Sequence, residues 1–425
     1  MFLIKLESKC ADYLQEGDDL RIPDQYRSCT MLVVVVYLLL SAGAAGFARA
    51  EAEAADDKPT IDELVTRISA LEAERELAAI AFDDGFDKGP TVGVFDGIEL
   101  DLGGFVTQTL TVAHGKDNTA VSPNQTLLEL LIRATVTERV SVFAALGWLR
   151  EADLDLKDPE SPEFRPQANR TPQIIAWTNY RHSDAIQLRI GRFVTPHGII
   201  NIEHFPPTLL EINQPQFLRP FPGATLFPNF MSGAEIHGRL HTKAGTLSHS
   251  LFGGIYSGAP EEWIVGGRLA SSVTDLGLTF GLNASTGARD AGPDNMRALA
   301  NFSTVPVLST RANNFSLVGA DVLFDRGRFL VKNEVFYSFE SKQPDRFGFY
   351  TQPAFRITDR WIAFYRFDYL DPGQGKEFGT STEHVVGVNF LPHHLVRIRG
   401  SVFFKEDIDA NKKTTIGQLS LTVSF

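Results

Sequence analysis

From about residue 95 to the C-terminus, the sequence alternates polar and apolar residues with a period of two. The last stretch shows one apolar face formed by Gly417, Leu419, Leu421, Val423 and Phe425. Residues 396–405 and 361–370 repeat the pattern, with arginine, lysine and aspartate on the other face. A soluble β-sandwich usually has strands of about five or six residues. Strands of about ten residues, with one apolar face and one charged face, instead favour a transmembrane barrel.

Short turns and longer polar connections strictly alternate between these stretches. The short turns lie at residues 137–139, 182–184, 244–245, 274–277, 325–327, 358–360 and 392–394. The longer connections are 114–124, 151–171, 195–230, 258–262, 287–312, 341–344, 372–381 and 406–412. Outer-membrane barrels have short periplasmic turns and long outer loops, and closing the ring leaves no unpaired sheet edge in hydrocarbon. The sequence therefore predicts an all-β fold, a sixteen-stranded antiparallel transmembrane β-barrel over residues 95–425, wide enough for an aqueous channel.

The N-terminal residues indicate export. The apolar run Leu32–Leu40 is followed by small residues ending in Ala48-Arg49-Ala50, which is typical of a signal peptide and its cleavage site. We interpret residues 1–50 as a leader and signal peptide, with a single-pass anchor as the alternative and with Met1 and Met31 both open as the start. Cys10 and Cys29 lie in this segment, so the cleaved chain would contain no cysteine.

Residues 51–94 predict an acidic linker and a short periplasmic helix. Residues 51–91 carry 12 acids and 4 bases. Ile61, Leu64, Ile68 and Leu71 follow at coiled-coil spacing, and Asp83–Pro90 would end the helix. We expect this helix to join chains into a homotrimer below the membrane; an amphipathic helix docked elsewhere is the alternative.

Several other functions find no support in the sequence. The net charge is −12 over 425 residues without a basic stripe, so no nucleic-acid partner is expected. Neither a G-x-S-x-G nor an H-E-x-x-H motif is present. His237 and His241 would stand about 13 Å apart on a strand, too far to share an ion. Asp290, Asp294 and Asn295 could bind calcium in an outer loop, but an ordinary solvated loop explains these residues more simply. We therefore expect no catalytic residue, no metal and no cofactor, and the chain is not expected to be an enzyme.

Alternation assigns a set of charged residues to the inner face of the barrel, where they would line the pore and attract anions. The predicted pore-lining bases are Arg133, Arg181, Arg189, Arg239, Arg268, Lys332, Arg356, Arg366, Arg397, Arg399 and Lys405. The acids on the same faces are Glu99, Asp101, Glu129, Glu235, Asp321, Glu334 and Asp368. The bases are the larger group. Pairing of bases with acids across neighbouring strands, which would only stiffen the wall, is the alternative.

The connection 195–230 is the third long loop and is rich in proline and phenylalanine. Such an apolar segment is expected to pack against other parts of the molecule rather than lie in water. We expect it to fold inward as a constriction loop, including Thr195, Pro196, Arg219 and Phe230. An outer lid or a contact between subunits is the alternative.

Particular motifs resemble the phosphate-selective porin family, porins O and P. These are the segment Gln187–Gly198, the loop that follows it, the segment Ser232–Gly238, and the later segments 364–368 and 386–390. The helix also resembles the periplasmic coiled coil of related sixteen-stranded porins. The resemblance implies a trimeric channel for small anionic solutes in the outer membrane of a Gram-negative bacterium, in contact with outer-membrane lipid. Arg219 is the one lysine or arginine in the loop, so phosphate selectivity is not carried over.

The sequence thus predicts an outer-membrane porin that passes small polar solutes, anions in particular, by passive diffusion. A barrel enzyme that hydrolyses lipid, and a structural or adhesive barrel with a closed lumen, are the alternatives.

Overall fold

The computed structural model describes residues 91–95, 98–116, 118–155, 163–166, 173–219, 226–242, 245–256, 262–290, 312–373 and 379–425. The predicted signal peptide, the acidic linker and the helix that would carry Ile61, Leu64, Ile68 and Leu71 lie outside these residues. Asp294 and Asn295, two of the three residues considered for calcium binding, also lie outside the described residues.

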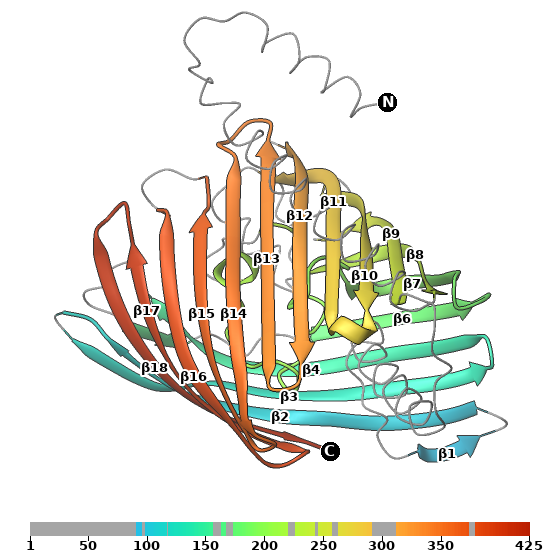
Figure 1. Ribbon diagram of the computed structural model, residues 1–425, viewed down its shortest axis with the longest axis horizontal. Helices are drawn as coiled ribbons and strands as arrows, with labels where there is room; N and C mark the ends of the chain where they lie inside the picture. The colour runs from blue at the N-terminus through green and yellow to red at the C-terminus, as the bar shows by residue number, and fades with distance from the viewer. Residues whose placement is uncertain are drawn as a thin grey trace, which may run out of the picture. The chain divides into compact units, whose positions relative to one another are not determined.

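Sixteen strands form the closed wall. They are β2 (Ile98–His114), β3 (Thr119–Thr137), β4 (Val140–Asp155), β6 (Gln173–Arg181), β7 (Gln187–Val194), β8 (Phe230–Thr242), β9 (Gly245–Ile255), β10 (Trp263–Val273), β11 (Leu278–Asp290), β12 (Ala312–Arg326), β13 (Phe329–Glu340), β14 (Arg346–Thr358), β15 (Trp361–Asp371), β16 (Ser381–His393), β17 (Val396–Asp407) and β18 (Lys412–Ser424). Each pairs antiparallel with the next, and β18 pairs with β2, which closes the ring. The predicted sixteen-stranded antiparallel barrel is confirmed. Figure 1 shows the C-terminal strands in front and β2–β4 crossing behind them.

Two short strands add to the ring without belonging to it. β1 (Thr91–Phe95) pairs with the start of β2, and β5 (Glu163–Pro166) pairs with the end of β4. β4 also pairs with β6, so β5 does not interrupt the wall. The sequence analysis did not predict either short strand. Within the described residues, no helix is long and apolar enough to cross a membrane.

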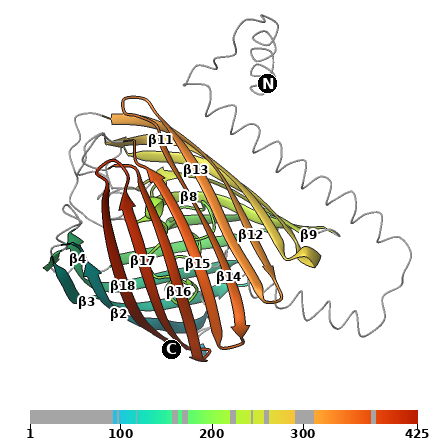
Figure 2. The ribbon, with the colours of Figure 1, turned by 60° about the vertical axis from the view of Figure 1, so that its left-hand side comes forward.

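The predicted alternation of connections is found along the chain. One end of the wall carries tight turns such as Glu138-Arg139, the 3-10 turn η2 (Thr274–Leu276) and Asp359-Arg360. The opposite end carries the longer connections, although the first of them is shorter than expected, because β3 already begins at Thr119. Figure 2 shows the neighbouring C-terminal strands lying side by side as hairpins.

The inner and outer faces of each strand differ as the period predicts. In β13, the alternate residues from Leu330 to Ser338 are buried, whereas Phe329 and Phe339 on the other face are exposed. β16 repeats this, with Glu383 buried and Val386 exposed. The buried face is thus the one that carries the charges, and the exposed face is mainly apolar. A soluble protein would show the reverse, so this arrangement suits a lipid-facing exterior.

The main hydrophobic cluster lies between the inner face of the wall and the connection 195–230. Phe205 contacts Phe105 of β2, with ring centroids 5.9 Å apart. Phe217 and Phe227 contact Phe336 of β13, at 5.5 Å and 5.0 Å. The short 3-10 turn η1 (Gln216–Leu218) is buried in this cluster. Because β2 and β13 lie far apart around the ring, this one connection joins distant parts of the wall.

Candidate channel lining and inner loop

The connection 195–230 begins with a buried turn held by neighbouring strands. The amide of Thr195 donates to the carbonyl oxygen of Asn229 at 2.9 Å, which closes the base of the loop next to Pro196 and Phe230. His197 is fully buried between Phe227 and Phe252, each at 5.1 Å between ring centroids. Its Nε2 lies 3.0 Å from Ser285 Oγ of β11. The start of the loop is therefore fixed against β9 and β11.

Gly198 requires a conformation and a space that other residues would not accept. Its φ is +68°, and a Cβ at this position would collide with the carboxylate of Glu334. Its amide donates to Asn283 Oδ1 of β11 at 3.0 Å. Only glycine reaches a left-handed φ without steric cost, so the sequence Pro196-His197-Gly198 turns the chain directly onto the wall.

Glu334 and Lys332 of β13 hold the next residues of the loop. Glu334 Oε1 accepts hydrogen bonds from the Ile200 amide at 2.8 Å and from the Tyr350 hydroxyl at 2.7 Å. Lys332 forms an ion pair with Glu203 of the loop. Both residues were predicted to line the pore, and the structure shows them bonded to the loop.

Arginines of β17 hold the middle of the loop by its backbone. Arg399 Nε donates to the carbonyl oxygen of Leu209 at 3.0 Å, and its other nitrogens donate to Pro206 O and to Thr422 Oγ1. Arg397 Nη1 donates to the same Leu209 oxygen at 2.9 Å. Arg399 as a whole is 1% exposed, and its guanidinium donors bond to the protein.

Arg219 lies within a cluster of four charges. It donates through Nη1 to Glu383 Oε2 of β16 at 2.8 Å, and its Nη2 bonds the other Glu383 oxygen. Arg366 of β15 donates to Asp368 at 2.9 Å and lies 3.4 Å from Glu383. Arg366 also donates to the carbonyl oxygen of Asn213 in the loop at 2.8 Å. The cluster thus joins the loop to two neighbouring strands.

The other predicted bases lie on the same alternate face of their strands. Arg189 pairs with Glu235 at 3.3 Å and stacks on Trp177, and Arg268 pairs with Asp321 at 2.6 Å. Arg356 pairs with Asp325 at 2.6 Å near the tight turns. Arg133, Arg239 and Lys405 are half-buried, opposite Asp101, Ser248 and Glu383 of adjacent strands. Strand-to-strand pairs therefore account for part of the predicted set.

The predicted acids occupy the same face. Asp101, Glu129, Glu235, Asp321, Glu334 and Asp368 are buried, and Glu99 is half-buried. Glu129 stands opposite Phe105 of β2 and Gly147 of β4. Its surroundings are thus largely apolar on both sides.

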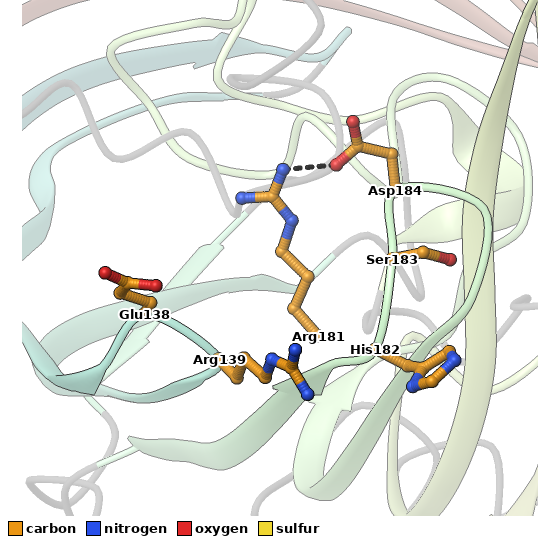
Figure 3. Close-up of a pocket in the computed structure, with 6 residues that line it drawn as sticks. All are labelled: Glu138, Arg139, Arg181, His182, Ser183 and Asp184. Atoms are coloured by element: carbon orange, nitrogen blue, oxygen red, sulfur yellow. Dashed lines mark hydrogen bonds and ion pairs between the residues drawn. The ribbon is translucent and has the colours of Figure 1, made fainter.

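Arg181 lies away from the loop, in an open crevice of about 350 Å³ at the end with the tight turns. Figure 3 shows the crevice between the β3–β4 turn and the β6–β7 turn, with Arg181 bonded to Asp184. Glu138, Arg139, His182 and Ser183 complete its lining. The charges of Arg181 and Asp184 balance each other, and both side chains are more than half exposed.

The titratable groups of the loop respond to burial. Burial lowers the pKa of His197 to about 3 and that of His204 to about 4, so both are neutral at pH 7. Burial would also lower the pKa of Arg219, but Glu383 outweighs this and raises it above its ordinary value. Among the described residues, no group of three or more histidines, cysteines and acids could hold a metal ion.

Some of the residues that hold the loop were not identified from the sequence. Glu383 was missed, although Val385, Gly387 and Asn389 continue its face of β16 and the period would have placed it inward. Asn283 and Ser285 were missed because short neutral polar residues are common on either face of a strand. Asn389, which donates to the Leu210 carbonyl at 3.0 Å, was missed for the same reason as Asn283 and Ser285.

Solved structures share this architecture at very low sequence identity. No protein-family model matches the chain, and no curated protein matches its sequence. An anion-selective porin from Comamonas acidovorans is similar with a TM-score of 0.51 and 11% identity, over 77% of this chain and 100% of that chain. OmpT, an outer membrane protein of Vibrio cholerae, is similar with a TM-score of 0.50 and 10% identity, over 78% of this chain and 98% of that chain. At such identity the likeness concerns the fold alone: this chain has the closed antiparallel barrel fold found in these outer-membrane proteins.

Proposed function

We propose that this protein is an outer-membrane porin, a passive diffusion channel for small polar solutes with a preference for anions. The observation that carries the proposal is the closed barrel with its two unlike faces. Charged and hydroxyl side chains line its interior, whereas large apolar side chains cover its exterior. A ring of sixteen strands is wide enough to leave an aqueous path.

In this proposal the connection 195–230 folds inward and narrows the channel. Its contacts with β2, β11, β13 and β15–β18 support this, because no outer lid could reach all these inner faces together. The predicted anion preference rests on bases such as Arg397 and Arg399, which donate to backbone carbonyls rather than to carboxylates. The motif Arg189–Gly198 supports a relation to the phosphate-selective porins, without a phosphate site.

The proposal extends to export and assembly. Residues 1–50 would be removed as a signal peptide, residues 51–94 would form the linker and helix and end in strand β1, and residues 95–425 would form the barrel. The spacing of Ile61, Leu64, Ile68 and Leu71 supports a homotrimer joined through that helix. Sizing the detergent-extracted protein with and without residues 51–82 tests this, and unchanged trimers would contradict a need for the helix.

Single-channel recording in a planar bilayer tests the channel itself. We expect stable open steps for the purified protein, and no lipid hydrolysis in a parallel assay with phospholipid vesicles. Hydrolysis without conductance would favour a barrel enzyme. Absence of both would favour a structural barrel whose lumen is filled by the aromatic cluster around Phe217, Phe227 and Phe336.

A further inference from the structure

The loop contains a single lysine or arginine, Arg219, and the structure places it inside the barrel. Its side chain is 17% exposed, while those of its partners Glu383 and Asp368 are 0% exposed. Both guanidinium Nη atoms contact the two oxygens of Glu383, and Nε donates to the Gln214 carbonyl of the loop itself. A fork-shaped contact of this kind fixes both distance and orientation.

A second arginine completes the cluster from the opposite direction. Arg366 belongs to the wall, but its Nη1 donates to the backbone of the loop at Asn213. Glu383 and Asp368 each lie near both arginines. Loop and wall therefore each contribute a base that binds the other, and two bases face two acids. These four groups carry no net charge between them, and Lys405 of β17 also stands opposite Glu383. Removing Arg219 and Glu383 together therefore leaves the net charge of the interior unchanged.

We propose that Arg219, Glu383, Arg366 and Asp368 form an ionic latch that holds the middle of the loop on β15 and β16 and thereby sets the width of the channel. The proposal rests on the proposed channel function. Arg219 acts as a positioning residue, since its contacts are with the protein and not with a solute. Loss of the latch loosens the part of the loop near η1, which then keeps only contacts such as those of Gln216 with Ser381 and of Phe217 with Phe336. The contacts at His197, Gly198 and Glu334 still hold the start of the loop.

The test removes the latch without changing the net charge. In the double variant Arg219→Gln/Glu383→Gln, we expect a larger single-channel conductance and an unchanged reversal potential in a salt gradient. A role in selectivity alone would move the reversal potential and leave conductance as it was. The matched control is Arg356→Gln/Asp325→Asn, which removes a similar fork-shaped pair that joins wall to wall. The control is expected to leave both measurements unchanged.

Hydrogen exchange of the backbone amides gives a readout that does not depend on conduction. Amides in residues 208–219 should exchange at least about tenfold faster in the double variant, because a lost buried ion pair lowers the cost of local opening. Arg219→Lys keeps the charge but not the fork, and should give an intermediate rate. Wild-type exchange rates in both variants would overturn the latch. Absence of conductance in the unmodified protein would overturn the channel instead, while the exchange rates would still decide on the latch.

Discussion

Two parts of the inner wall use arginine in different ways. On β10–β12, Arg268 contacts both oxygens of Asp321, and Asn283 of the strand between them donates to the same carboxylate at 2.8 Å. On β17, Arg397 and Arg399 donate to backbone carbonyls of the loop. In the part of the chain that the structure describes, neither Arg397 nor Arg399 takes part in an ion pair. The first arrangement ties strands together with balanced charge, whereas the second holds the loop and leaves positive charge in the interior.

The largest expected effect distinguishes these two parts by stability. Arg268→Gln should cost about 3–5 kcal/mol in free energy of unfolding, because the buried Asp321 carboxylate loses its ionic partner. Arg399→Gln should cost less, about 1–3 kcal/mol, because neutral carbonyl groups lose a donor that glutamine partly replaces. Urea unfolding of both variants in lipid vesicles measures the difference. Equal losses would show that the two parts of the wall are held in the same way.

The attachment of the loop to β13 can be tested by substituting glycine. Gly198→Ala should destabilise the protein by about 2–4 kcal/mol, since it adds a steric conflict with Glu334 to the cost of a left-handed φ. Gly327 is the matched control, with φ +59° and no neighbouring atom within 4 Å. Gly327→Ala should cost only about 1 kcal/mol from the backbone alone. Unfolding curves that coincide for the two variants would contradict a close contact between Gly198 and Glu334.

The sequence predicted the wall well and the loop contacts poorly, for physical reasons. A period of two specifies which face of β13 or β17 is inward, because a shift by one residue would turn every side chain over. Two partners of Arg399 are backbone carbonyls about 190 residues earlier in the chain, and carbonyls have no signature in the sequence. Gly198 ends the segment Gln187–Gly198 that the sequence analysis singled out, but its contact with Glu334 depends on closure of the whole ring. Local patterns thus predict elements, while the site depends on long-range contacts.

Acid should loosen the loop through its two buried histidines, His197 and His204. The pKa of His197 is lowered to about 3 and that of His204 to about 4, against 6.5 for an exposed histidine. Below pH 6.5 the two histidines are protonated in the unfolded chain but stay neutral in the folded one. The free energy of unfolding therefore decreases as the pH is lowered, until the folded pKa of each histidine is reached. Between pH 6.5 and 5 the loss is about 2 kcal/mol for each histidine.

Hydrogen exchange of the loop at pH 7 and pH 5, corrected for intrinsic rates, measures this effect. His204→Asn should reduce the pH dependence by about half, since it removes one of two similar groups. His393, the exposed last residue of β16, provides the control His393→Asn. A loop whose protection does not change between these pH values would show that the histidines are not buried as neutral rings.

The smallest expected effect concerns ion selectivity, and it compares the arginines of β17 with Arg268 of β10. Arg397→Gln/Arg399→Gln removes two positive charges that form no ion pair within the described residues, so the preference for anions should weaken. The double variant Arg268→Gln/Asp321→Asn removes a balanced pair and should leave the reversal potential unchanged. A unit charge acting through water at about 10 Å is worth only about 0.4 kcal/mol before screening, so each arginine changes the local concentration of a passing anion by about twofold. The difference should nearly vanish at 1 M salt, where the Debye length is about 3 Å, compared with about 10 Å at 0.1 M. Cation preference in the unmodified protein would instead show that buried acids such as Glu129, Glu235 and Glu334 dominate the field.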